Sequence, residues 1–204
     1  MKVKLREKVN MNKILVFIFH GMTDYESTFV THLLNTSGNK EIVTVAYEKK
    51  LVKGRSGFDI LPSMVVSEVK MEEFEGLIVP GGWNGDLRPE LTNLIKALNK
   101  QGKLLAGICG AGTVFLAKAG VLENVQYTTP VSSWTERHKE VFGMEDPFPR
   151  KNLIFKRMVR DKNIITAQGT AFVDFAIEIC DWFNLFENPE EKASFHKEIV
   201  GVPL

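Results

Sequence analysis

The chain has 204 residues, with 26 lysines and arginines against 25 aspartates and glutamates, and a formal net charge of +1. Such a balance produces no net field toward nucleic acid or an anionic membrane, so we expect neither as a partner. The hydrophobic fraction of 44% and the charged fraction of 25% are typical of a globular domain, and they exclude a disordered or collagen-like chain.

The N-terminal residues do not have the pattern of a secretory signal. Residues 1–10 are charged and lack the apolar centre of a secretory signal, and apolar runs such as 14–19 are far shorter than the roughly 18 residues that a membrane helix needs. We therefore expect a cytoplasmic protein. Residues 1–10 are interpreted as an N-terminal extension, 11–186 as a single domain, and 187–204 as a C-terminal tail helix.

Short apolar runs alternate with stretches of helical period, which is typical of βαβ units around a parallel sheet. We expect strands at 13–19, 41–47, 76–79, 103–108, 155–160 and 163–167, and a short hairpin or edge strand within 58–66. We expect helices at 24–35, 88–100, 110–119 and 170–186. Residues 127–150 break the alternation, so we expect an inserted helix and loop near 130–150.

Cys109 stands where a buried strand meets a helix, in the segment Gly107-Ile-Cys-Gly-Ala111. This pattern resembles the nucleophile elbow G-x-S-x-G, with cysteine replacing serine and alanine at the last position. The positive end of the helix would favour the thiolate. The alternative is a small buried residue, as free cysteines often are. Cys180 lies on the apolar stripe of its helix and is interpreted as core.

Pro80-Gly81-Gly82 ends a strand at the same edge of the sheet. Glycine lets a backbone N–H approach a bound oxyanion closely, so Gly82 and Gly110 are candidates for an oxyanion hole. An ordinary glycine turn explains the motif equally well. If Gly82 and Gly110 form an oxyanion hole, Trp83 and Asn84 would flank the cysteine pocket.

Glu26 falls in the first predicted helix, close to the same edge. Its carboxyl is a candidate neighbour of the thiol. However, Thr23-x-x-Glu26 also matches a capping box, and a cap needs no catalytic role. The local pattern by itself favours the cap.

Four motifs occur in order along the chain: Gly21-x-x-x-x-Glu26, Pro80-Gly81-Gly82, Ala106-Gly-Ile-Cys109-Gly-Ala-Gly112 and Ile165-Thr-Ala-Gln-Gly-Thr170. Together they resemble the ThiJ/PfpI family. The resemblance implies an α/β fold, a flavodoxin-like three-layer sandwich of the class I glutamine amidotransferase type, with a mostly parallel central sheet, helices on both faces, and a homodimer. It also implies that Cys109 is a nucleophile or redox centre and that Glu26 is its acidic partner, with a protonated carboxyl donating a hydrogen bond to the sulfur.

The chain departs from the family pattern in its histidines. Gly110 replaces the histidine that follows the cysteine in the protease and amidase members, and Tyr127-Thr-Thr-Pro130 occupies the stretch where other members have one. His20 ends the first strand and points to the correct edge, although a structural role is common there. His138 lies in a helix-like, charged setting, but the inserted segment could fold over the site.

His32 and His196 are two further histidines, and we place neither at the site: His32 lies in the first helix, and His196 is interpreted as part of a solvated face.

The elbow cysteine together with the resemblance implies a cysteine-dependent hydrolase, similar to the protease/amidase members of the family, that acts on a small-molecule or peptide substrate. The alternatives are glyoxalase- or deglycase-type chemistry on reactive aldehydes, a non-enzymatic sensor whose cysteine oxidises to sulfinate, and a catalytically silent scaffold. The predicted site comprises Cys109 and Glu26, an oxyanion hole of Gly82 and Gly110, and, as site-lining candidates, His20, Trp83 and His138. We predict no cofactor and no metal.

Overall fold

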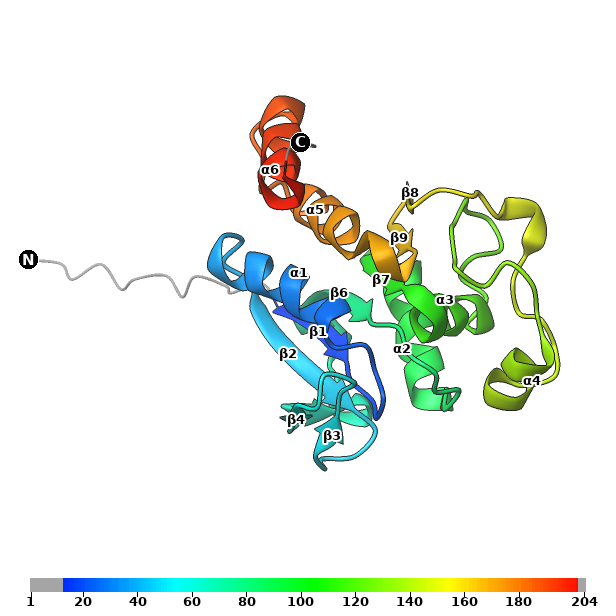
Figure 1. The fold of residues 1–204 in the computed structure, drawn as a ribbon. Coiled ribbons are helices and arrows are strands. Elements are labelled where there is room, and N and C mark those ends of the chain that lie inside the picture. Colours follow the sequence, from blue (N-terminus) through cyan, green and yellow to red (C-terminus); the bar gives the residue numbers. More distant parts are fainter. Residues whose placement is uncertain (1–12, 202–204) are drawn as a thin grey trace, which may run out of the picture.

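Seven strands form one sheet in the order β5-β2-β1-β6-β7-β9-β8 in the computed structural model, which describes residues 13–201 (Figure 1). The strands are β1 (Lys13–Phe17), β2 (Glu41–Ala46), β5 (Met64–Val65), β6 (Phe74–Val79), β7 (Leu104–Ile108), β8 (Met158–Asp161) and β9 (Ile164–Ala167). All neighbouring pairs are parallel except β8 with β9. The carboxyl ends of β1, β6, β7 and β9 therefore meet at one edge. The predicted extension 1–10 lies outside the described residues.

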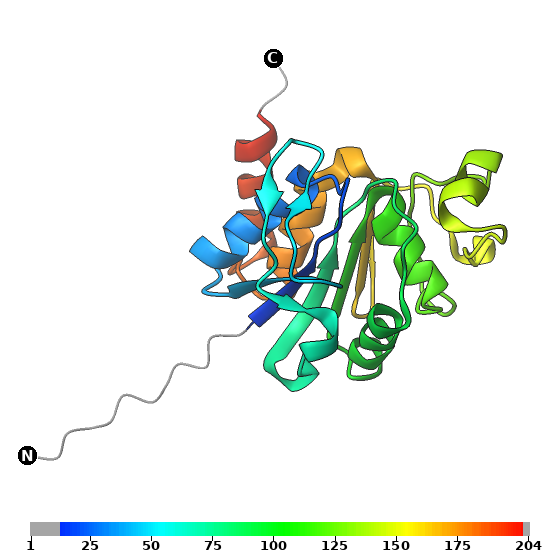
Figure 2. The same ribbon diagram turned by 90° about the horizontal axis from the view of Figure 1, so that it is seen from below.

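Helices cover both faces of this sheet. They are α1 (Tyr25–Thr36), α2 (Pro89–Lys100), α3 (Cys109–Lys118), α4 (Glu136–Phe142), α5 (Phe172–Trp182) and α6 (Pro189–Val200). Figure 2 shows α1 and α5 together on one face and α2 with α3 on the other. The central strands β1 and β7 are apolar on both sides because neither side faces water. The predicted three-layer α/β sandwich is confirmed.

A two-stranded hairpin of β3 (Val52–Lys53) and β4 (Asp59–Ile60) stands apart from the main sheet. Its turn packs against Asp24, the residue before α1, whose side chain is 1% exposed. Ser56 donates to the Asp24 carboxylate through its N–H at 3.2 Å and its hydroxyl at 2.5 Å. The hairpin is thereby attached to the first turn of α1, which also carries Glu26.

α6 packs along α5 at the end of the described chain. Lys192 of α6 pairs with Glu178 and Asp181 of α5 at 2.7 and 3.2 Å. Within residues 13–201, every helix is too short or too polar to span a bilayer.

The turn from β7 into α3 places Cys109 in a left-handed conformation, with φ of 61°. A residue with a side chain adopts this conformation at an energetic cost of about 1–3 kcal/mol, so the surrounding packing must hold it. Two glycines permit that packing. A Cβ on Gly107 would stand 2.6 Å from the Gly112 carbonyl oxygen, and a Cβ on Gly112 would stand 2.4 Å from the Val79 carbonyl oxygen. The start of α3 is therefore pressed directly onto β6 and β7.

We expect Gly112→Ala to destabilise the protein by about 2–3 kcal/mol, because the added methyl group would overlap backbone that cannot move aside. Gly110→Ala is the matched control in the same helical turn, since its Cβ would meet only the Gly82 carbonyl oxygen, at 3.0 Å. Urea unfolding of both variants measures the difference. Equal stabilities would contradict this account of the elbow.

Candidate functional site

Cys109 and Glu26 meet at the carboxyl edge of the sheet, although they are far apart in the sequence. The Glu26 side chain is 1% exposed, and its Oε2 accepts a hydrogen bond of 2.7 Å from the Gly81 N–H. A Cβ on Gly169 would stand 2.8 Å from Glu26 Oε1 and 3.0 Å from Cys109 Sγ. A Cβ on Gly81 would crowd the same two side chains. The two glycines leave the space in which carboxyl and thiol face each other.

The capping box that the local sequence favours for Glu26 is wrong. The N-cap of α1 is Asp24, and no side chain caps this helix end. The carboxyl of Glu26 instead turns to the Gly81 N–H and the Cys109 thiol. Gly81 follows β6 and Cys109 follows β7, so both partners are distant in the sequence and a local pattern has no means of including them.

Burial raises the pKa of the Glu26 carboxyl to about 7. The hydrogen bond from Gly81, the interaction with Cys109 and the positive charge of Arg55 all act in the opposite direction, but they do not outweigh burial. Glu26 therefore exchanges its proton near neutral pH, where an exposed glutamate would be fully ionised.

The pKa of the Cys109 thiol is raised to about 11, first by burial and then by the negative charge of Glu26. The Gly110 N–H, at the start of α3, lowers this pKa by less. The predicted preference for thiolate is therefore wrong when Glu26 is ionised, because burial and the carboxylate outweigh the helix end. Between pH about 7 and about 11, the pair holds one proton.

The two glycines predicted to form an oxyanion hole lie next to each other, since a Cβ on Gly110 would stand 3.0 Å from the Gly82 carbonyl oxygen. The Ala111 N–H donates to the Gly82 carbonyl oxygen at 3.2 Å, which fixes the 80–82 turn on the start of α3. Gly82 also pairs with Met22 in an isolated antiparallel bridge, so the loop after β1 belongs to the same small framework. The Gly110 N–H faces the sulfur.

Trp83 and His138 are brought together at the rim of this framework. The His138 ring is stacked between Trp83 and Trp134, with centroid distances of 5.3 and 5.4 Å. Its Nδ1 accepts from the Thr135 N–H at 3.1 Å, so the histidine caps α4. Burial lowers the pKa of His138. The inserted segment thus attaches to the loop that follows Gly82, and Trp83 rather than the imidazole adjoins the glycines.

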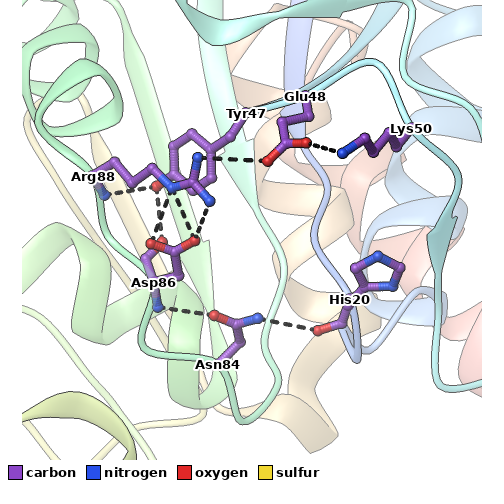
Figure 3. A network of polar contacts seen from close by, with 7 residues as sticks. All are labelled: His20, Tyr47, Glu48, Lys50, Asn84, Asp86 and Arg88. Carbon is purple, nitrogen blue, oxygen red and sulfur yellow. Dashed lines mark hydrogen bonds and ion pairs between the residues drawn. The ribbon is translucent and has the colours of Figure 1, made fainter.

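His20 lies in a different cavity, of about 320 Å³, at the carboxyl ends of β1 and β2. Its Nδ1 accepts from the Lys53 N–H at 3.1 Å, and its carbonyl oxygen accepts from Asn84 at 3.3 Å. Figure 3 shows Arg88 on the opposite wall, held beside Tyr47. His20 and Asn84 therefore line a neighbouring cavity rather than the predicted cysteine pocket.

The described residues offer Cys109 no histidine partner. Among the hydrogen bonds of residues 13–201, none joins an imidazole to Cys109 or Glu26, and His196 pairs with Asp174 of α5 at 3.2 Å. The same residues contain no group of three or more histidine, cysteine, aspartate or glutamate side chains placed to hold a metal ion. The only titratable group that interacts with the thiol through a hydrogen bond in the described chain is the Glu26 carboxyl.

Arg55 is a site neighbour that the sequence did not indicate. It belongs to the turn 54–57 of the hairpin, and its positive charge lowers the pKa of both Glu26 and Cys109. A turn of glycine, arginine and serine predicts only a change of direction. No local signal shows that this turn docks beside the first turn of α1.

Comparison with known proteins gives a family and a fold. A model of the DJ-1/PfpI family matches residues 12–181. The chain is similar to a Bacillus subtilis protein named "Uncharacterized protease YoaZ", with 26% identity over 196 residues, 91% of this chain and 89% of that protein. It is also similar to a protein named a deglycase from Thermococcus kodakarensis, with 27% identity over 123 residues, 59% of this chain and 73% of that protein.

Solved structures match over nearly the whole chain. A DJ-1 superfamily protein from Agrobacterium tumefaciens superposes with a TM-score of 0.77 and 25% identity, covering 93% of this chain and 98% of that one. A thiJ/pfpI family protein from Bacillus anthracis superposes with a TM-score of 0.74 and 24% identity, covering 91% and 89%. The second likeness concerns the fold alone.

We expect Glu26→Gln to change how stability depends on pH. A carboxyl whose folded pKa lies above its unfolded value contributes stability at low pH and loses it as pH rises through the folded pKa. A shift from 4.5 to about 7 corresponds to about 3 kcal/mol. The wild-type protein should therefore lose about this much relative to Glu26→Gln between pH 4.5 and pH 8.5.

Urea unfolding at the two pH values measures this difference. Glu136→Gln is the control, because that carboxyl is 83% exposed and should leave the pH dependence unchanged. Parallel stability curves for the wild type and Glu26→Gln would contradict a raised pKa at Glu26.

Proposed function

The chain belongs to the DJ-1/PfpI family, and we propose that it is a cysteine-dependent enzyme that acts on small, reactive carbonyl compounds. Cys109 is the nucleophile and Glu26 carries the proton. The observation that supports this proposal is the buried carboxyl at the thiol, with a pKa of about 7. In this proposal the carboxyl takes the role of proton acceptor that an imidazole has in a cysteine protease.

The proton on the pair decides how the reaction begins. Addition of sulfur to a carbonyl requires the thiolate, and the thiol of Cys109 is a weak acid in this setting. Glu26, in its carboxylate form, accepts the thiol proton as the S–C bond forms, and then passes it to the oxygen of the carbonyl. The product is a hemithioacetal, and no proton has left the site.

An α-oxoaldehyde can then proceed without an external oxidant. The Glu26 carboxylate removes the proton from the carbon bonded to sulfur, and the adjacent carbonyl oxygen gains a proton, so that an enediol forms. Glu26 then returns its proton to the second carbon, and the hydroxyl on the first carbon loses its proton as the thioester carbonyl forms; this second proton balances the one gained by the other oxygen. The first carbon is oxidised to a thioester while the second is reduced to an alcohol, so the electrons balance within the substrate. Water hydrolyses the thioester, which releases an α-hydroxy acid and restores the thiol.

The backbone N–H of Gly110, which faces the sulfur, is suited to stabilise the developing oxygen charge in these steps. The N–H of the adjacent Gly82 is the second donor in this proposal. Preorganised donors of this kind act most strongly where water is excluded. The strained, tightly packed elbow supplies that rigidity.

A hydrolase is the second candidate, because the similar Bacillus subtilis protein that covers most of the chain is named a protease. Amide hydrolysis would use the same nucleophile and the same N–H donors. It differs in needing a proton for the departing amine, which Glu26 would supply after accepting it from the thiol. Amide and peptide substrates therefore belong in the same assay as aldehydes.

We expect the protein to convert methylglyoxal to lactate. Cys109→Ala should remove this turnover, and Glu26→Gln should lower kcat by about 10²–10⁴-fold, because the proton carrier is lost. NMR of substrate and product measures both. Cys180→Ala is the control, since Cys180 is buried in α5 and should retain activity.

Turnover that survives Cys109→Ala would reject thiol catalysis. Cys109-dependent cleavage of amides, without conversion of aldehydes, would replace the first proposal with the hydrolase.

We expect kcat/KM for methylglyoxal to rise with pH through about 7 and then level off. Below the Glu26 pKa of about 7, the pair carries two protons, and the carboxyl cannot accept one from the thiol. The rate should therefore fall about tenfold for each further pH unit below this value. Initial rates from pH 5.5 to 8.5 test this, and a flat profile would exclude Glu26 as the proton acceptor.

A further inference from the structure

The hairpin turn that contains Arg55 lies directly alongside the catalytic loops. The Arg55 N–H donates to the Met22 carbonyl oxygen at 2.9 Å. Met22 in turn bridges Gly82, and the neighbouring Thr23 N–H donates to the Gly81 carbonyl oxygen at 2.8 Å. These backbone contacts form a row from the hairpin to the glycine turn. The backbone of Arg55 therefore lies at the edge of the cysteine site.

Asp24 fixes this turn in position. A Cβ on Gly54 would stand only 2.3 Å from Asp24 Oδ2, and Ser56 donates twice to the same carboxylate. Because a buried carboxylate needs such donors, the side chain at 1% exposure holds the turn firmly. Asp24 is the N-cap of α1 and Glu26 lies in its first turn, so the hairpin and the catalytic carboxyl share one support.

The guanidinium of Arg55 has no protein partner among residues 13–201. The side chain is exposed and takes part in no ion pair, hydrogen bond or stacking contact there. Four other arginines of the described chain pair with carboxylates: Arg88, Arg150, Arg157 and Arg160. The charge of Arg55 nevertheless lowers the pKa of Glu26 and of Cys109, although it is the smallest influence on each. The backbone contacts of the hairpin turn with Met22 place this residue at the side of the cysteine site.

We propose that Arg55 recognises a carboxylate on the substrate, and that the preferred substrates are small α-oxoaldehydes that carry such a group. The guanidinium has the planar, two-pronged donor geometry that matches a carboxylate. An anionic substrate would otherwise be repelled by the ionised Glu26, and Arg55 offsets this repulsion at the entrance. The inference rests on the proposed function for the reaction, but charge recognition at Cys109 is testable without any turnover.

The first experiment compares two alkylating reagents that differ in charge. Iodoacetate carries a carboxylate and iodoacetamide is its neutral counterpart, and both modify Cys109 at the same atom. By mass spectrometry we measure the alkylation rate of Cys109 with iodoacetate divided by its rate with iodoacetamide. This ratio is normalised to the same ratio for free cysteine. In Arg55→Gln this normalised ratio should fall about fivefold or more, because an attractive charge near the sulfur has been removed. Arg55→Lys should retain most of the wild-type ratio, because the positive charge is kept.

Lys50→Gln is the matched control, since Lys50 is a cation on the adjoining loop whose side chain is 80% exposed. It should leave the ratio within twofold of the wild type. A ratio that is the same in wild type and Arg55→Gln overturns the proposal, whatever the enzymatic activity. Using a ratio removes any general change in thiol reactivity that the substitution causes.

The second experiment uses a matched pair of aldehydes. 4,5-Dioxopentanoate carries a carboxylate where 2-oxopentanal has a methyl group. For Arg55→Gln we expect KM for the carboxylate aldehyde to rise about tenfold or more, with kcat/KM for the neutral aldehyde within threefold of wild type. Equal losses on both aldehydes overturn the assignment of specificity. If the wild-type protein converts neither aldehyde, the proposed function is rejected. The alkylation ratio still decides whether Arg55 recognises an anion.

Discussion

The contact between the buried Glu26 carboxyl and the Cys109 thiol is the constraint around which the carboxyl edge of the sheet is arranged. Two acidic groups in a largely dry space cannot both ionise readily, so they keep a proton between them near neutral pH. The contact exists only because Gly81 and Gly169 lack side chains and because the Gly81 N–H holds the carboxylate in place. Each of these glycines belongs to a different loop, so the pair depends on the whole sheet edge being assembled.

Strain and destabilisation are concentrated at this point. Cys109 has a left-handed backbone, Glu26 is a buried acid, and the start of α3 presses on neighbouring backbone. Each feature weakens the fold locally, and the continuous apolar core of β1, β6 and β7 compensates. Such a combination is characteristic of a site shaped for chemistry rather than for stability.

Two peripheral segments shape the surroundings of the site in different ways. The hairpin of β3 and β4 is held by Asp24 and brings Arg55, whose guanidinium pairs with none of residues 13–201, to the loop before α1. The inserted helix α4 uses His138 as a helix cap and as the middle ring of a stack with Trp83 and Trp134. An imidazole placed in this way has a structural function. The solved relatives share the fold at about a quarter identity or less.

The sequence by itself determined the alternation of strands and helices around a parallel sheet and the elbow that carries Cys109. These features follow from period, length and the small residues around a turn, which are local properties. The resemblance carried by four motifs added Glu26, where the local pattern preferred a cap. Only the tertiary structure decided what the carboxyl of Glu26 binds, that His20 lies in another cavity, that His138 is a stacked cap, and that Arg55 stands beside the site. Each of these outcomes depends on contacts between segments distant in the chain, and on the burial that such contacts create.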